Sequence, residues 1–339
     1  MNIYDVSRQA GVSIATVSRV INNNTNVSEK TRAKVLSVIE ENGYTPNAFA
    51  RGLGLNTMKT IGILCPDCSD AYIAQAVYHI EQGLRKNGYD CLLCCTGFEK
   101  KVKEKSMELL ISKRVDSIVM VGSFYTEDDD AENEYIRLAS KDIPIMLVNG
   151  KLAAPNIYCT LCDDSAGVYD VTSLFIESGH TRILYIYDTL SFSSSNKLDG
   201  YRKAIKDAGI TEENTLFIKQ SSGEKIDDVV RALSEYKDFE KKFDGIIASD
   251  DIIAIGALKY AKKCGISVPD QLFVSGYNNS EFGRCSEPEV TTVDNKLEAI
   301  CHQCVTTLMG VFAGNSMPKM TVFSADVVPR ATTDFKERT

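Results

Sequence analysis

The sequence contains no tryptophan, and no apolar run approaches the roughly 18 residues that a membrane-spanning helix needs. The opening stretch MNIYDVSRQAG is polar from Asp5 onward and lacks the apolar core of a signal peptide. We therefore expect a cytoplasmic protein that does not contact a membrane and whose 11 cysteines stay reduced. Without tryptophan, stacking on the face of a bound sugar would fall to Tyr72, Phe192 or Phe282.

Signatures of common enzymes are also missing. The apolar segment 61–65 is followed by CPDCSDAY and not by the G-x-G-x-x-G loop of dinucleotide sites. No G-x-S-x-G occurs, and the 3 histidines, His79, His180 and His302, lie far apart along the chain. His180 precedes a predicted strand in ESGHTRILYI, which favours a structural role. An enzyme on an α/β scaffold is therefore the less favoured alternative, and we expect no cofactor and no catalytic residue.

The composition is that of a globular protein, with 44% hydrophobic and 25% charged residues. The formal net charge of −8 is unevenly distributed. Up to Thr60 the chain has seven Lys or Arg against four acids, whereas the remainder has 31 against 42. This asymmetry indicates a basic head able to meet a polyanion and an acidic body that a polyanion would repel.

The head has the pattern of three short helices. Ile3, Val6 and Ala10 predict a first helix over 2–10, which Gly11 ends. Ser13 is placed to cap a second helix that runs to about Ile21. Ser28 is placed to cap a third helix that Gly43 ends. The predicted buried residues are Val17, Val20 and Ile21 of the second helix and Val35, Leu36, Val38 and Ile39 of the third.

Two short helices joined by a tight turn are typical of a helix-turn-helix, whose second helix enters the DNA major groove. Ile14 and Ala15 would point outward and could pack on thymine methyl groups, and Arg19 could donate two bonds to guanine. Thr16, Ser18 and Asn22 could bond phosphate oxygens. From the spacing of the apolar residues alone, the alternative to DNA binding is a helical hairpin with a purely structural role.

The segments IYDVSRQAGVSIATVSRVINN and VSEKTRAKVLSVIEENGYTPNAFARGL, with VVPRATT near the end, resemble the lactose/galactose-repressor family of bacterial transcription regulators. The resemblance covers the whole chain. It implies a homodimer that binds a palindromic double-stranded operator, with Ile14, Ala15 and Arg19 as the main base readers. The implied phosphate or groove-edge contacts are Tyr4, Ser13, Thr16, Ser18, Asn22, Ser28 and Thr31.

The resemblance divides the chain into a headpiece (1–45), a hinge or linker (46–60) and an effector-binding and dimerisation domain (61–339). In the family the hinge helix pairs with its twin across the dimer and enters the minor groove. It implies DNA contacts for Asn47 and Ala50, and Leu53 takes the position of a leucine wedge that kinks the duplex. Gly52 and Gly54 depart from the usual helix formers. A plain linker without DNA contacts is the alternative on the residues alone.

From Thr60 onward, short apolar strands alternate with amphipathic helices. This order predicts parallel sheets covered on both faces, and its repetition predicts two similar lobes. The pattern resembles the two-lobed fold of periplasmic binding proteins, which the repressor family attaches to its headpiece. Lobe 1 would take about 61–160 and 293–321, and lobe 2 about 162–290 and 323–332. The chain would pass between lobes near 159–163, 290–295 and 321–324.

In such sheets a ligand binds beyond the carboxyl ends of the strands, which are polar here. A sugar or a similar small polar effector could bond these side chains across the cleft. A non-sugar metabolite is the alternative. The candidate effector-binding residues are Asp70, Tyr72, Asn149, Ser193, Lys197, Asp250, Tyr277 and Asn278. Some acids at these ends could instead cap helices, and Asp251 is a candidate for this.

Several candidates depart from the family pattern, so the usual hexose contacts are not all implied. Asp70 and Asp250 stand where asparagine is usual, and Lys197 stands where an arginine grips sugar hydroxyls. Asn149-Gly150 replaces a common Asp-Arg pair, and Asn278 replaces an aspartate.

Four CxxC pairs occur, at 65–68, 91–94, 159–162 and 301–304. Zinc binding or redox sensing would explain such an excess. However, residues three apart on a strand, as in CLLC, face opposite sides, and CHQC on a helix offers only two thiols. We therefore expect buried apolar thiols and no metal site.

Overall fold

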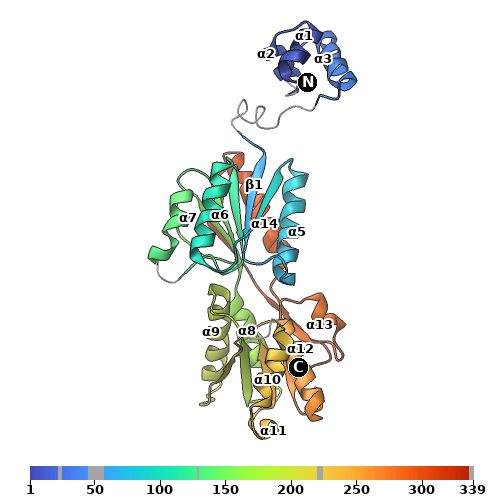
Figure 1. Ribbon diagram of the computed structural model, residues 1–339. Coiled ribbons are helices and arrows are strands. Elements are labelled where there is room, and N and C mark those ends of the chain that lie inside the picture. The colour runs from blue at the N-terminus through green and yellow to red at the C-terminus, as the bar shows by residue number, and fades with distance from the viewer. Residues whose placement is uncertain (22–24, 45–56, 128–129, 220–223, 336–339) are drawn as a thin grey trace.

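The structure, a computed structural model, describes residues 1–21, 25–44, 57–127, 130–219 and 224–335 (Figure 1). Three helices form the headpiece: α1 (Ile3–Ala10), α2 (Ile14–Ile21) and α3 (Glu29–Glu41). None of the helices in these ranges is long and apolar enough to cross a bilayer.

Local capping fixes the headpiece helices. The side chain of Asn2 accepts from the Asp5 amide while the Asp5 carboxylate accepts from the Asn2 amide. Gly11 ends α1 with φ of 60°, a left-handed conformation that glycine adopts without steric cost. The hydroxyls of Ser13 and Ser28 accept from the amides of Thr16 and Thr31 at 3.2 and 3.3 Å. These contacts satisfy amide donors that a helix N-terminus leaves free.

The headpiece core is small and aliphatic. Its fully buried members are Val6, Ala10, Val17, Val20 and Val35. The prediction of a buried Leu36 was wrong, because that side chain is 47% exposed. Val38 and Ile39, from the following turn of α3, pack against this core instead.

Lobe 1 contains a parallel sheet in the order β11-β5-β4-β3-β1-β2. Its strands are β1 (Thr60–Cys65), β2 (Asp90–Cys95), β3 (Ser117–Val121), β4 (Ile145–Val148), β5 (Ile157–Cys162) and β11 (Met320–Phe323). Its helices are α5 (Ala71–Lys86), α6 (Lys100–Ser112), the short η1 (Asp130–Asn133), α7 (Glu134–Ala139) and α14 (Leu297–Phe312). Two apolar cores cover its faces, one under α5 and α14 and one under α6 and α7.

Lobe 2 repeats the plan, with a sheet in the order β12-β10-β9-β8-β6-β7 in which only β12 is antiparallel. Its strands are β6 (Ile183–Tyr187), β7 (Asn214–Phe217), β8 (Gly245–Ala248), β9 (Phe273–Tyr277), β10 (Thr291–Asp294) and β12 (Asp326–Val328). Its helices are α8 (Asp164–Glu177), α9 (Phe192–Asp207), α10 (Lys225–Ser234), α11 (Phe239–Lys242), α12 (Asp251–Cys264) and α13 (Glu281–Cys285). The predicted α/β architecture of two lobes behind a helical headpiece is thus confirmed.

The chain passes between the lobes three times. It leaves lobe 1 between β5 and α8, returns between β10 and α14, and crosses again between β11 and β12. In Figure 1 these segments run side by side between the two sheets. Each lobe is therefore built from separate stretches of sequence, and the connecting segments lie next to the strand ends that face the other lobe.

Gly200 sets the distance between α8 and α9, which pack closely in lobe 2. A Cβ atom at Gly200 would lie 2.2 Å from the backbone oxygen of Ser165. We expect Gly200→Ala to lower the free energy of unfolding by about 2 kcal/mol, since backbone cannot move as a side chain can. Gly310→Ala is the matched control, because the three atoms nearest to its Cβ all belong to the flexible side chain of Met317. Chemical denaturation followed by circular dichroism measures both, and equal losses would contradict this steric role.

Candidate functional site

The outward face of α2 carries the predicted base readers. Ile14 is 40% exposed and Ala15 and Arg19 are also exposed, while Val17 and Val20 on the opposite face are buried. Tyr4 of α1 is 63% exposed. The helix therefore presents two apolar side chains and one guanidinium on a single surface, the combination that reads base edges in a major groove.

Two pairs of hydroxyl residues in the headpiece lie at helix N-termini. The Ser13 hydroxyl bonds that of Thr16 at 2.9 Å, and the Ser28 hydroxyl bonds that of Thr31 at the same distance. Ser18 is half-buried on α2. Helix N-termini favour anions, so these groups suit phosphate contacts. Asn22, Asn47, Ala50 and Leu53 fall outside the described residues.

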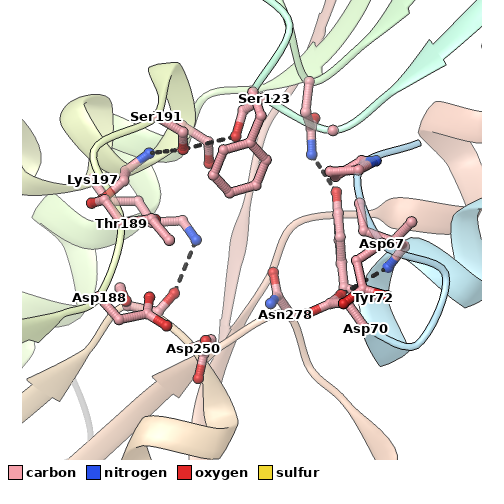
Figure 2. Close-up of a pocket in the computed structure, with 18 of the residues that line it drawn as sticks. Asp67, Asp70, Tyr72, Ser123, Asp188, Thr189, Ser191, Lys197, Asp250 and Asn278 are labelled. Atoms are coloured by element: carbon pink, nitrogen blue, oxygen red, sulfur yellow. Dashed lines mark hydrogen bonds between the residues drawn. The ribbon is translucent and has the colours of Figure 1, made fainter. Parts of the chain in front are cut away.

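A cleft of about 240 Å³ lies between the lobes at the carboxyl ends of the strands (Figure 2). Seven of the eight predicted effector-binding residues line it: Asp70, Tyr72, Asn149, Ser193, Lys197, Asp250 and Asn278. Asp67, another residue of the polar stretch after β1, also lines the cleft, and the further lining residues include Phe98, Ser123, Phe124, Asp188, Thr189, Ser191, Ser194, Lys225, Ser249 and Asn295.

The ends of β1 and β4 supply polar residues to the lobe 1 wall. Asp70 caps α5 by accepting from the Ile73 amide at 3.0 Å, and the first turn of this helix lies at the cleft. The side-chain amide of Asn149 donates to the hydroxyl of Tyr72. Asn149 has φ of 59°, a left-handed conformation that asparagine tolerates better than most residues. Burial raises the pKa of Tyr72 well above its usual value, so its hydroxyl stays protonated.

The lobe 2 wall contains an ion triad. The ammonium of Lys225 lies 2.7 Å from the Asp188 carboxylate and 2.6 Å from that of Asp250. Burial disfavours the charged forms of Lys225 and Asp250. The two aspartates nevertheless raise the pKa of Lys225, and the Lys225 ammonium holds the pKa of Asp250 below its usual range. Asp250 also caps α12 by accepting from the Ile253 amide at 2.8 Å. The triad therefore carries a net charge of −1 into the cleft.

Lobe 2 also contains a second cluster of polar side chains, next to the ion triad. The ammonium of Lys197 donates to the backbone oxygen of Ser249 at 2.9 Å and lies 3.7 Å from the centre of the Tyr277 ring. The carboxylate of Asp164 accepts from the hydroxyls of Ser193 and Tyr277, each at 2.5 Å. Burial lowers the pKa of Lys197 and raises that of Asp164. Tyr277 is 1% exposed, and its ring packs against the ammonium of Lys197. It therefore does not line the cleft, contrary to the prediction.

Two buried amide oxygens in the cleft wall have no hydrogen-bond donor among the described residues: Asn149 Oδ1 and Asn295 Oδ1. The nitrogen of Asn295 donates to Asn278 Oδ1 at 3.0 Å, which fixes its orientation. Buried acceptors without a donor are costly, so these oxygens mark positions where a ligand donor gains most. The sequence offered a signal for Asn295, since it lies in the predicted crossing between the lobes near 290–295.

The lobes also touch each other beside the cleft. The hydroxyl of Ser123 donates to that of Ser191 at 2.8 Å. The backbone amide of Phe192 donates to the backbone oxygen of Ser123 at 3.4 Å. Phe192 packs against the lobe 1 core, and Phe98 and Phe124 are the phenylalanines that line the cleft. Phe282 lines a neighbouring pocket that it shares with Asp70 and Tyr72. Of the three aromatics predicted for stacking, only Tyr72 therefore lies in the main cleft.

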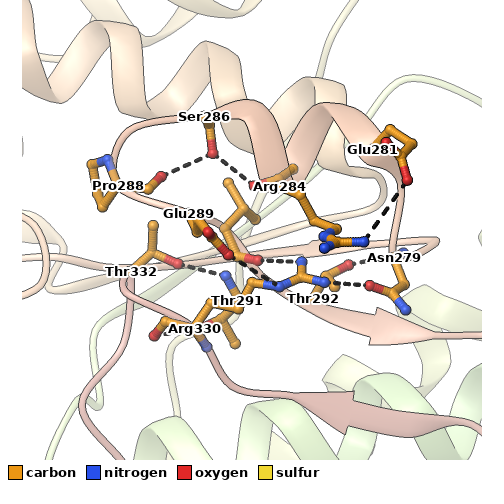
Figure 3. A network of polar contacts seen from close by, with 12 residues as sticks. Asn279, Glu281, Arg284, Ser286, Pro288, Glu289, Thr291, Thr292, Arg330 and Thr332 are labelled. Carbon is orange, nitrogen blue, oxygen red and sulfur yellow. Dashed lines mark hydrogen bonds and ion pairs between the residues drawn. The ribbon is translucent and has the colours of Figure 1, made fainter.

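Asp251 does not cap α12. Its carboxylate accepts from the amide and hydroxyl of Ser280 at 2.6 and 2.7 Å and from the hydroxyl of Thr292 at 2.6 Å. Burial raises its pKa to about 6. The neighbouring guanidinium of Arg330 donates to Asn279 and to the backbone oxygen of Val290 (Figure 3). The contacts of Asp251 with Ser280 and of Arg330 with Asn279 hold the loop that carries Asn278 at the cleft.

The cysteines are all free, and those of the CxxC pairs are largely inside the lobes. Cys159, Cys162, Cys301 and Cys304 are buried, and burial raises the pKa of Cys162 and of Cys301 to about 12. Cys65 and Cys95 are direct neighbours on β1 and β2, with sulfur atoms 3.8 Å apart. In the described ranges, no cysteine belongs to a set of three metal-binding side chains whose ligand atoms lie within 4.8 Å of one another.

Comparison with known proteins agrees with this architecture. Residues 2–47 match the bacterial regulatory proteins of the lacI family, and residues 172–333 match the periplasmic binding protein-like domain. A solved structure of the Lac repressor dimer bound to operator and the anti-inducer ONPF superposes with a TM-score of 0.85 at 23% identity, over 98% of each chain. A CelR–cellobiose complex gives 0.70 at 24% identity, over 98% of this chain and 99% of that one.

Relatives found by sequence have a higher identity to this chain than these two solved structures. An HTH-type transcriptional regulator of Lachnoclostridium phytofermentans is 50% identical over 335 residues, 99% of this chain and 100% of the relative. The regulator GalR of Escherichia coli is 32% identical over 336 residues, 97% of this chain and 94% of GalR. Both relatives are HTH-type transcriptional regulators. The chain therefore belongs to the LacI family of bacterial regulatory proteins, as a DNA-binding transcriptional regulator with a periplasmic-binding-protein-like effector domain.

Proposed function

We propose that this protein is a homodimeric repressor that binds a palindromic operator and whose operator affinity is controlled by a sugar or sugar-like polyol in the interlobe cleft. The observation that carries the effector class is the pair of buried amide oxygens without donors, Asn149 Oδ1 and Asn295 Oδ1. A hydroxyl group can donate to such an acceptor and at the same time accept from a neighbouring donor, which suits a cleft that offers both.

The charge of the cleft supports a neutral effector. Its lining contains four carboxylates, from Asp67, Asp70, Asp188 and Asp250, and two ammonium groups, from Lys197 and Lys225. Lys225 is already paired, and Lys197 donates to a backbone oxygen. A phosphate or carboxylate ligand would therefore enter a field of net negative charge, which is unfavourable. The hydroxyls of Ser193 and its neighbours add donors and acceptors that suit a polyol.

The order of the modules supports coupling between effector and operator. The linker enters β1, and the loop after β1 supplies Asp67 and Asp70 to the cleft. Closure of the lobes around a ligand would shift these elements relative to lobe 2, and in a dimer it would change the spacing of the two headpieces. Leu53 and its twin would then pair or separate in the minor groove.

A thermal-shift screen of neutral sugars and polyols against the full chain tests the effector class, with sugar phosphates and nucleobases as contrasting ligands. We expect neutral polyols to raise the unfolding temperature and to change operator affinity in a binding assay. A shift given only by phosphorylated or purine ligands would overturn the polyol proposal and support a non-sugar effector.

For a polyol found in that screen, we expect Asn295→Ala to weaken binding about tenfold, since a buried hydrogen bond contributes about 1–1.5 kcal/mol. Operator affinity without ligand should stay unchanged. Asn315→Ala, at an exposed position beyond α14, is the matched control. Titration calorimetry measures both, and wild-type affinity in Asn295→Ala would show that this amide does not contact the effector.

A further inference from the structure

Two of the three histidines meet on the surface of lobe 1 although 223 positions separate them in the sequence. His79 projects from α5 and His302 from α14, and their ring centres lie 6.5 Å apart. Glu298, one turn before His302 on α14, has a carboxylate oxygen 3.7 Å from His302 Nε2. One ligand atom from each of the three side chains lies within 4.8 Å of the other two.

The fold holds these side chains on a rigid base. α5 and α14 share an apolar core that includes Ile80, Leu84, Cys301 and Val305. The helices approach closely at Gly83, where a Cβ would lie 3.1 Å from a methyl group of Val305. Because the backbones are fixed by this packing, only side-chain rotations are needed to bring the three ligand atoms together. His79 is half-buried, whereas Glu298 and His302 are exposed.

We propose that His79, Glu298 and His302 form a binding site for a divalent transition-metal ion of the zinc type. Two imidazoles and a carboxylate are a ligand set that zinc takes with bonds of about 2.0–2.2 Å, and they leave a fourth position for water or another ligand. With only one oxygen ligand, the set does not suit Mg²⁺ or Ca²⁺. None of the three residues lines the effector cleft.

The site would link α5 and α14, both of which begin at the boundary between the lobes. α14 starts two residues after Asn295, and α5 carries Tyr72 in its first turn. His79 and Glu298 also line a groove with Asn278 and Asn279, the loop that faces the cleft from lobe 2. A bound ion would therefore fasten together two lobe 1 helices next to the segment on which the lobes move.

Cobalt is a suitable probe, because 11 thiols in this chain could compete for the metal and Co²⁺ reports which atoms hold it. The full chain, kept reduced, is titrated with Co²⁺ and then with Zn²⁺. We expect one Co²⁺ per chain, visible d–d absorption without a sulfur-to-cobalt charge-transfer band, and displacement of the cobalt by zinc.

His302→Ala and Glu298→Gln should each weaken cobalt binding at least about tenfold. Both positions are exposed, so the variants should fold. Thr306→Ala, exposed one turn further along α14, is the matched control and should bind as the wild type does. Undiminished binding in His302→Ala, a sulfur charge-transfer band, or no binding of either metal would overturn the proposal. Operator and effector binding do not enter this readout, so failure here is distinguishable from failure of the proposed function.

Discussion

Replacement of Lys225 by methionine should lower the free energy of unfolding at neutral pH by about 3 kcal/mol, the lower end of the cost of removing one partner from a buried ion pair, because the side chains of Lys225 and Asp250 are 24% and 19% exposed. Lys225 is the cation between two carboxylates at 2.6 and 2.7 Å, and the Asp188 side chain is only 4% exposed. Methionine keeps most of the side-chain volume but leaves two like charges facing each other. The loss therefore comes from uncompensated charge and not from a cavity.

The effect should depend on pH in a defined direction. The pKa of Asp250 is lowered in the folded wild type, so its contribution is present above the ordinary value of 3.8 and is lost as the pH falls through the folded-state pKa. The pKa of Lys225 is raised, so its contribution is present below the ordinary 10.5 and is lost as the pH rises through the folded-state pKa. The difference between wild type and variant should be largest between about pH 5 and pH 10 and shrink as the pH falls below about 4.

Denaturation at several pH values measures this difference. Lys241→Met is the matched control, because Lys241 pairs with Asp238 at 3.1 Å with both side chains mostly exposed. Such a surface pair contributes little, so its removal should change stability by less than about 1 kcal/mol at any pH. Equal behaviour of the two variants would mean that the triad is solvated and does not stabilise the cleft.

Arg19→Ala should weaken operator binding by about 1–3 kcal/mol and relax the base preference at one position of each half-site. Arg19 is exposed in the last turn of α2, on the face that also carries Ile14 and Ala15. A guanidinium there can donate two parallel bonds to guanine, and alanine removes both without disturbing the buried Val17 and Val20 on the other face.

Binding to the operator, to single-base variants of it and to unrelated DNA separates the two roles that Arg19 could have. A base contact predicts a loss confined to sequences with the recognised base, whereas a phosphate contact predicts the same loss on all DNA and a shallower dependence on salt. Arg202→Ala, an exposed arginine of lobe 2 paired with Glu213 at 2.8 Å, controls for the loss of one positive charge. It should bind operator as the wild type does.

Some strands could not be predicted from sequence pattern. The alternation predicts strands over 183–188, 245–250 and 273–277, and these segments contain β6, β8 and β9. Strands β5, β10, β11 and β12 were not predicted, because they lie in the segments that pass between the lobes. β11 pairs with β5 across some 160 positions of sequence, so its partner is not visible in any local pattern.

What the sequence determined by itself was the local structure: the capped headpiece helices, the alternation of strands and helices, and the polar strand ends at Asp70, Asn149 and Asp250. These depend on spacing and on residues within a few positions of one another. Only the tertiary structure decided that Lys225 joins Asp188 and Asp250, that Tyr277 lies beneath Lys197, and that His79 meets His302. Sheet order and helix packing set the distances between residues far apart in the chain, and these follow from the whole core and not from any one segment.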